Sequence, residues 1–97
     1  MPVLTPAQIK NELASLKEWQ YLTDEICSQI VFDTFEDAYA FVRRVADLAI
    51  EVNHHPTLLW SYTQLTLSLA THDEGGITEK DIDFARRVDK IDVPRAM

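Results

Sequence analysis

Cysteine, glycine and long apolar runs are scarce in this 97-residue sequence. The single cysteine, Cys27, has no partner for an internal disulfide bond, which favours a reducing, cytoplasmic setting. The first residues lack the apolar run of a secretion signal, and no stretch approaches the roughly 18 apolar residues of a membrane helix. With two glycines and no low-complexity tract, residues 1–97 are expected to fold as a single domain.

Basic residues are also few, since 9 Lys and Arg oppose 16 Asp and Glu for a net charge of −7. Binding to phosphate groups depends on clustered cations, so neither a nucleic-acid partner nor a membrane partner is expected. The two basic pairs, Arg43-Arg44 and Arg86-Arg87, fall in helical patterns beside acidic residues. They are interpreted as solvated helix faces.

Cap signals and hydrophobic periodicity define the first half of the chain. Thr5, followed by a proline, caps a helix that ends near Leu16. Two extended segments, 19–22 and 26–32, then form a hairpin. Thr34 caps a long helix whose apolar residues repeat at three- and four-residue steps. Phe41 and Leu48 lie off the expected sheet-facing stripe and would suit a contact between helices of two subunits, although burial within one chain could also explain them. The expected stripe consists of Phe35, Ala38, Tyr39, Val42, Val45, Ala46, Ala49 and Val52.

The second half repeats the pattern. Pro56 disfavours helical geometry at the preceding residue, so the long helix is expected to end near Asn53. Strands follow at 58–63 and 64–71, and Thr78 opens a last helix. The order helix, two strands, helix, two strands, helix predicts an α+β fold with a four-stranded antiparallel sheet and helices packed on one face. The open face and edges of so small a sheet favour pairing with another subunit.

The three histidines all lie at the ends of expected elements, where sites are commonly formed. His54 and His55 follow the long helix, and His72 follows the last strand. Histidines placed across a small substrate can donate and accept protons near neutral pH without a cofactor. Three surface histidines can also occur without function. A metal site with Asp73 or Asp81 is a further alternative, disfavoured because adjacent histidines converge on one ion only in irregular backbone.

Other candidate residues have structural explanations. Cys27 falls in an expected strand and fits a small core residue better than a nucleophile. Asp81 stands three residues after Thr78 and can complete a capping box. Trp60 and Tyr62 share a strand face, so they can be packing residues or an aromatic wall for a flat heterocycle.

The segment NHHPTLLWSYTQLTLSLATHDEGGITEKD resembles the signature of the pterin-4a-carbinolamine dehydratase family. Both residue types and spacing match at His54, His55, Pro56, Tyr62, His72 and Asp81. The resemblance implies that family's α+β fold and a hydro-lyase reaction. In this reaction the 4a-hydroxytetrahydropterin left by an aromatic amino acid hydroxylase loses water to give the quinonoid dihydropterin. The enzyme thereby serves the recycling of a tetrahydrobiopterin-type cofactor.

The resemblance also implies roles for the residues that match. His54 and His72 would form the acid-base pair, and His55 would assist binding or proton transfer. Asp81 would hold or polarise the site, and Tyr62 would line it. No metal or other cofactor is implied. The partners would be a small pterin substrate and further copies of the chain, in a homodimer joined through the sheets or a homotetramer built through helices.

One position departs from the family pattern. Four residues before His54 the family usually has a polar side chain, whereas this chain has Ile50. Glu51 lies about 100° further round the helix and does not replace it. A carboxylate that orients His54 is therefore expected to be missing, which would lower the activity or alter the substrate. The alternative function is a non-catalytic protein-binding module of the same fold, similar to a transcription-factor dimerisation cofactor or a Rubisco assembly factor.

Overall fold

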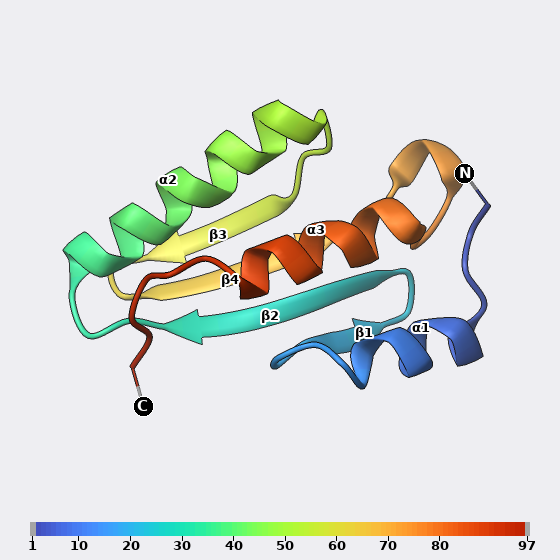
Figure 1. The fold of residues 1–97 in the computed structure, drawn as a ribbon, viewed down its shortest axis with the longest axis horizontal. Helices are drawn as coiled ribbons and strands as arrows, with labels where there is room; N and C mark the ends of the chain where they lie inside the picture. The colour runs from blue at the N-terminus through green and yellow to red at the C-terminus, as the bar shows by residue number, and fades with distance from the viewer. Residues whose placement is uncertain (1, 97) are drawn as a thin grey trace.

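The computed structural model of the chain describes residues 2–96. Its elements follow the expected α-β-β-α-β-β-α order, with one additional turn of 3-10 helix (Figure 1). They are α1 Pro6–Leu13, β1 Gln20–Leu22, β2 Glu25–Val31, α2 Phe35–Val52, β3 Thr57–Ser61, β4 Gln64–Leu69, η1 His72–Glu74 and α3 Glu79–Asp89. The predicted α+β fold is therefore confirmed.

The four strands form one antiparallel sheet in the order β1-β2-β4-β3. Each hairpin closes with a two-residue turn, because Leu22 pairs with Glu25 and Ser61 pairs with Gln64. Since Tyr62 belongs to the second turn, the expected strand 58–63 ends earlier than predicted. Figure 1 shows α2 beside β3, and α3 in front of β4 and β2.

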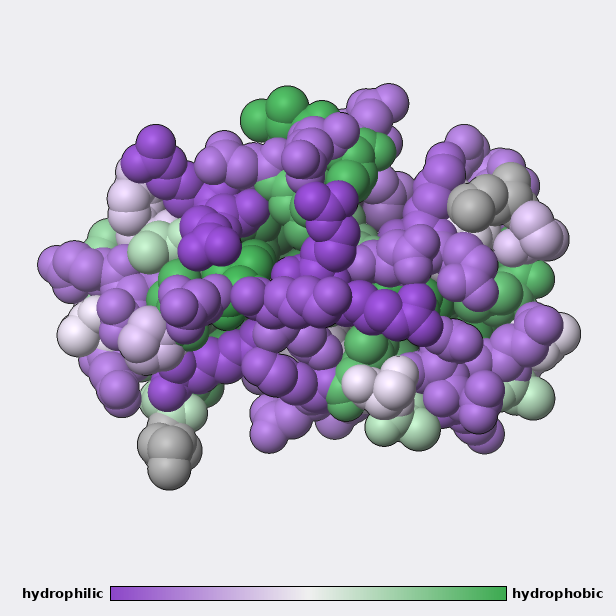
Figure 2. Space-filling model, viewed as in Figure 1, coloured by the Kyte–Doolittle hydropathy of each residue, from purple (hydrophilic) through white to green (hydrophobic). Residues whose placement is uncertain are grey.

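The core lies between the helices and one face of the sheet. Leu65, Leu67 and Leu69 of β4 alternate toward the helices and are at most 1% exposed. They pack with buried residues of α2 and α3, namely Ala38, Phe41, Val45, Leu48, Ala49, Ile82, Phe84, Ala85 and Val88. Over α3 the surface is mainly hydrophilic, and hydrophobic surface shows between α3 and α2 (Figure 2).

The expected core stripe of α2 was wrong at its edges. Phe41 and Leu48 are buried within the chain, whereas Phe35 and Tyr39 are about half exposed. Both alternatives repeat at three- and four-residue steps and share Val45, so periodicity alone leaves the centre of the stripe undefined. Packing against the sheet selects the face that carries Phe41.

Candidate active site

The end of α2 determines where His54 lies. Asn53 caps the helix in the left-handed conformation, with φ 53° and ψ 46°. The backbone N–H groups of Asn53 and His54 both donate to the carbonyl of Ala49, which closes the last turn. The left-handed residue turns the chain out of the helix direction before Pro56 and β3. His54 thereby leaves α2 facing α3.

Asp81 is the hydrogen-bonding partner of the His54 imidazole. Its Oδ1 lies 2.6 Å from His54 Nε2, and its Oδ2 accepts hydrogen bonds from Thr71 Oγ1 at 2.8 Å and from the backbone N–H of Thr78 at 2.9 Å. The Asp81 side chain is 0% exposed, and that of His54 is 12% exposed. The first turn of α3 and the end of β4 therefore hold one carboxylate against the histidine.

The hydrogen-bond directions around Asp81 follow from counting protons. Thr71 has one hydroxyl proton, which it donates to Asp81, so the Thr78 hydroxyl 2.8 Å away donates to Thr71. The carboxylate then accepts from Thr71, from the Thr78 backbone and from His54 Nε2. With its proton on Nε2, a neutral His54 keeps an unprotonated Nδ1 that can accept a proton.

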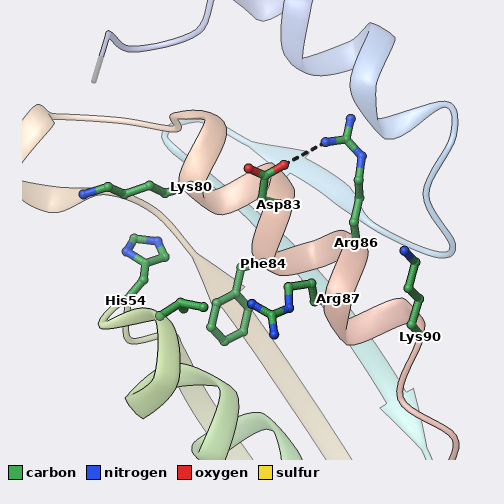
Figure 3. A pocket seen from close by; sticks show the side chains of 8 residues that line it. His54, Lys80, Asp83, Phe84, Arg86, Arg87 and Lys90 are labelled. Carbon is green, nitrogen blue, oxygen red and sulfur yellow. Dashed lines mark hydrogen bonds and ion pairs between the residues drawn. The ribbon is translucent and has the colours of Figure 1, made fainter.

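A pocket of about 430 Å³ lies beside His54. Val52 and Phe84 supply its apolar lining, and the Phe84 ring contacts the imidazole edge-on with centroids 6.2 Å apart. Figure 3 shows His54, Lys80 and Phe84 arranged around this space, with Arg87 further along α3. Phe84 is only 2% exposed, so its ring backs the imidazole from the core and leaves little aromatic surface in the pocket.

The antiparallel register brings the other two histidines to the same end of the sheet. Thr57 pairs with Ser68, so the chain before β3 runs beside the chain after β4. His72 directly follows Thr71, the donor to Asp81. His55 and His72 are exposed, and within residues 2–96 neither ring has a hydrogen-bonding partner. Both rings are therefore accessible to a ligand.

Tyr62 is not brought together with His54 in one chain. It occupies the turn after β3, at the opposite end of that strand, and is 71% exposed. Its ring stacks toward Phe35, with centroids 6.3 Å apart, and Phe35 also stacks on Trp60 at 5.0 Å. The expectation that Trp60 and Tyr62 share a strand face was wrong, because the strand ends at Ser61.

The described residues also bear on the alternatives. In residues 2–96, no group of three or more His, Cys, Asp and Glu side chains is placed to hold a metal ion. No helix in this range is long and apolar enough to cross a membrane. Cys27 is buried, and this burial, aided by the charge of Glu25, raises the pKa of its thiol. That shift keeps the thiol protonated and poorly nucleophilic.

Comparison with known proteins adds a relationship that covers nearly the whole chain. The model of the family described as pterin 4 alpha carbinolamine dehydratase matches residues 2–91. The chain belongs to this family. A Herpetosiphon aurantiacus protein that carries the family's name is 44% identical over 94% of this chain and 95% of its own length. One from Thermosynechococcus vestitus is 41% identical over 93% of this chain and 95% of its own length.

Two solved structures extend the dehydratase family relationship to the fold. A transcriptional coactivator/pterin dehydratase from Brucella melitensis superposes with a TM-score of 0.85 at 33% identity, covering 89% of this chain and 94% of the other. A pterin dehydratase-like protein identified as a RuBisCO assembly factor in the alpha-carboxysome gives 0.61 at 25% identity, covering 74% of this chain and 83% of the other. The same fold thus occurs under names that describe different functions.

The departure at Ile50 of this dehydratase-family chain lies on the surface. Ile50 is 75% exposed, and the adjacent Glu51 forms an ion pair of 2.6 Å with Arg87 on α3. Glu51 is therefore paired with Arg87, which lines the pocket, and does not contact His54.

Sequence reasoning missed several residues around His54. Thr78 was expected only as a cap, and Lys80 and Phe84 were given no part in the site. The sequence did contain a signal for Thr71. This polar residue continues the alternating series of inward-facing leucines in β4, Leu65, Leu67 and Leu69. A polar residue at an inward position must find a partner, which here is Asp81.

Proposed function

We propose that this chain catalyses the dehydration of a 4a-hydroxytetrahydropterin to the quinonoid dihydropterin, in the recycling of a tetrahydrobiopterin-type cofactor. The observation that carries the proposal is His54, hydrogen-bonded through Nε2 to the buried Asp81 beside a pocket of about 430 Å³. The family relationship supports the same reaction class.

The reaction breaks the bond between C4a and the hydroxyl oxygen and removes the proton from N5, forming the C4a=N5 double bond and releasing water. His54 Nδ1 accepts the N5 proton, since the Nε2 N–H of His54 donates its hydrogen bond to Asp81. His72 supplies the proton that converts the leaving hydroxyl into water, and His55 assists binding or proton transfer. Two such proton transfers account for accelerations of about 10²- to 10⁴-fold each.

The pocket supports binding of the pterin ring near these groups. Val52 is 38% exposed and would provide an apolar contact, and the ring would displace water from beside His54. Tyr62 can line the site only from another subunit, because its own chain holds it at the far end of β3. A homodimer or homotetramer, which would also cover the open sheet face, is part of this proposal.

The experiment is a stopped-flow measurement of carbinolamine breakdown. The pure protein should accelerate the reaction above its spontaneous rate, and a variant carrying both His54→Ala and His72→Ala should return it to that rate. Ser15→Ala, at an exposed position after α1, is the matched control and should keep full activity. A folded wild-type protein with no acceleration, or full activity in the double variant, would overturn the proposal.

A second candidate function is a non-catalytic protein-binding module. It is favoured by the exposed aromatic residues at the end of the sheet distant from His54, namely Phe35, Tyr39 and Tyr62, and by the RuBisCO assembly factor of similar fold. Under this alternative, Tyr39→Ala with Tyr62→Ala should abolish capture of a stable partner, and the histidine variants should leave it unchanged. A protein that dehydrates pterins and captures no partner would exclude this function.

A further inference from the structure

Positive charge gathers at the pocket although the chain as a whole is acidic. Four of its nine Lys and Arg residues line the pocket beside His54, together with a single carboxylate, that of Asp83. These cations are Lys80, Arg86, Arg87 and Lys90, all on α3 or at its C-cap. Three of them lie at the C-terminal end of α3, where the helix dipole favours cations, whereas Lys80 lies at the opposite end.

Ion pairs within the chain account for only two of these cations. Arg86 contacts Asp83 at 2.9 Å and also Glu12, and Arg87 contacts Glu51 at 2.6 Å. Lys80 and Lys90 have no ion-pair partner among residues 2–96. Two uncompensated ammonium groups therefore remain at the pocket.

The position of Lys80 is unfavourable for the helix that carries it. It lies in the first turn of α3, where the partial positive charge of the helix end favours anions and disfavours cations. Lys80 lines the pocket, and Figure 3 shows its side chain running past the imidazole of His54. Helix stability therefore does not explain this lysine, whereas a negatively charged ligand near His54 would.

We propose that the pterin bound here carries an anionic substituent, a phosphate or a carboxylate, on its side chain. This inference rests on the proposed function and specifies its substrate class. The ring would lie against Val52 and His54, and the substituent would meet Lys80 or extend along α3 toward Lys90. Ten residues of helix separate these lysines by about 15 Å, a length that an extended pterin with a side chain can span.

Binding of unreactive dihydropterins to the intact protein tests the inference. The probes are 7,8-dihydrobiopterin, with an uncharged side chain, 7,8-dihydroneopterin phosphate, and 7,8-dihydrofolate, which carries two carboxylates. At low salt at least one anionic probe should bind about tenfold or more tightly than dihydrobiopterin, as expected for one charge-assisted contact. The advantage should shrink as salt is raised.

Variants separate this charge effect from ring binding. Lys80→Gln combined with Lys90→Gln should abolish the preference, lowering the affinity for the anionic probes about tenfold more than the affinity for dihydrobiopterin. Lys10→Gln removes an exposed lysine on α1 that does not line the pocket, and it should retain the preference. Stronger binding of the phosphate probe would identify phosphate as the recognised group, and stronger binding of dihydrofolate would identify carboxylate.

The outcomes also separate this inference from the proposed function. Equal affinity for all three probes, or a preference that survives the double lysine variant, would overturn the anionic substituent. Dehydration of a neutral carbinolamine would then still support the proposed reaction. No binding of any dihydropterin by the folded protein would overturn both.

Discussion

His54 Nε2 and Asp81 Oδ1 lie 2.6 Å apart and connect the end of α2 to the first turn of α3. The same carboxylate accepts the backbone N–H of Thr78, so it caps α3 and orients the histidine at once. Its other donor, Thr71, extends the network to the end of β4. The buried Asp81 carboxylate thereby links α3 and the end of β4 to the end of α2, and it fixes the orientation of the His54 imidazole.

Replacing Asp81 by Asn should damage both activity and stability. The amide keeps the shape but cannot accept every donor that the carboxylate accepts, and its NH₂ group faces the Nε2 proton of His54 or a donor from Thr71 or Thr78. We expect kcat to fall about 100-fold or more and the free energy of unfolding to fall by about 1–3 kcal/mol. Steady-state kinetics and urea unfolding measure the two effects. Asp83→Asn, at an exposed position on the same helix, is the stability control, and equal unfolding curves for both variants would contradict the expectation.

Thr71→Val should reveal the support behind Asp81. The substitution keeps the side-chain shape but removes the donor to Asp81 and the acceptor for the Thr78 hydroxyl in a buried network. The free energy of unfolding should fall by about 1–3 kcal/mol. Thr66→Val, on the open face of β4, should change it by less than about 0.5 kcal/mol. Similar denaturant midpoints for the two variants would show that the network contributes nothing.

The left-handed cap at Asn53 should tolerate glycine and resist alanine. A Cβ-bearing residue other than Asn or Asp costs about 1 kcal/mol in this conformation, so Asn53→Ala should destabilise the protein while Asn53→Gly should not. The alanine variant should also lower kcat, because the cap directs His54. Thermal unfolding of both variants measures the effect, with Asn11→Ala on α1 as the control. A fully stable Asn53→Ala protein would argue against strain at this residue.

Ile50→Glu tests the departure from the family pattern. Ile50 is 75% exposed, so the free energy of unfolding should change by no more than about 0.5 kcal/mol. A carboxylate one turn before His54 should raise kcat by orienting the imidazole and stabilising the imidazolium formed when it accepts the N5 proton, whereas Ile50→Gln should raise it less. Dehydration kinetics of the three proteins provide the comparison. Equal rates would mean that Asp81 alone suffices to orient the histidine.

Cys27 should react slowly with thiol reagents. Burial, reinforced by the charge of Glu25, raises the pKa of its thiol, so less thiolate is present at pH 8 than in an exposed cysteine. Modification by Ellman's reagent should therefore be slow in the native protein and fast in urea. A cysteine introduced by Gln29→Cys, at an exposed position of β2, should react rapidly in a Cys27→Ser background. Rapid native modification of Cys27 would contradict its burial.

The order of elements was predictable because its signals are local. Thr5, Thr34 and Thr78 are N-caps in the structure, as their positions before apolar periodic segments predicted. The face of α2 was less predictable, because Phe41 and Tyr39 both fit a helical period and only the sheet decides between them. The end of β3 was predicted wrongly for a similar reason, since Tyr62 continues the strand pattern in the sequence but lies in the turn.

The residues of the candidate site remain a prediction, and their contacts could not be predicted from the sequence. The spacing pattern indicated both His54 and Asp81, yet the bond between them joins residues 27 apart in sequence. It depends on the left-handed conformation of Asn53, to which residue type gives only a weak preference. The cationic lining of the pocket could not be predicted either, because in the sequence Lys80 and Arg87 resemble ordinary solvated helix residues. Only the packing of α3 beside α2 places them at the pocket.

Asp81 both caps α3 and holds His54, so the reactivity of the site depends on the folding of the first turn of α3. If the first turn of α3 unwinds, the cap and the anchor of His54 are lost in one event, well before the whole protein melts. Fraying of these few residues would therefore inactivate the site, and conditions or ligands that stabilise this turn would raise the fraction of molecules competent to react. The backbone amide of Thr78, bonded to Asp81, is the natural hydrogen-exchange reporter of that fraction.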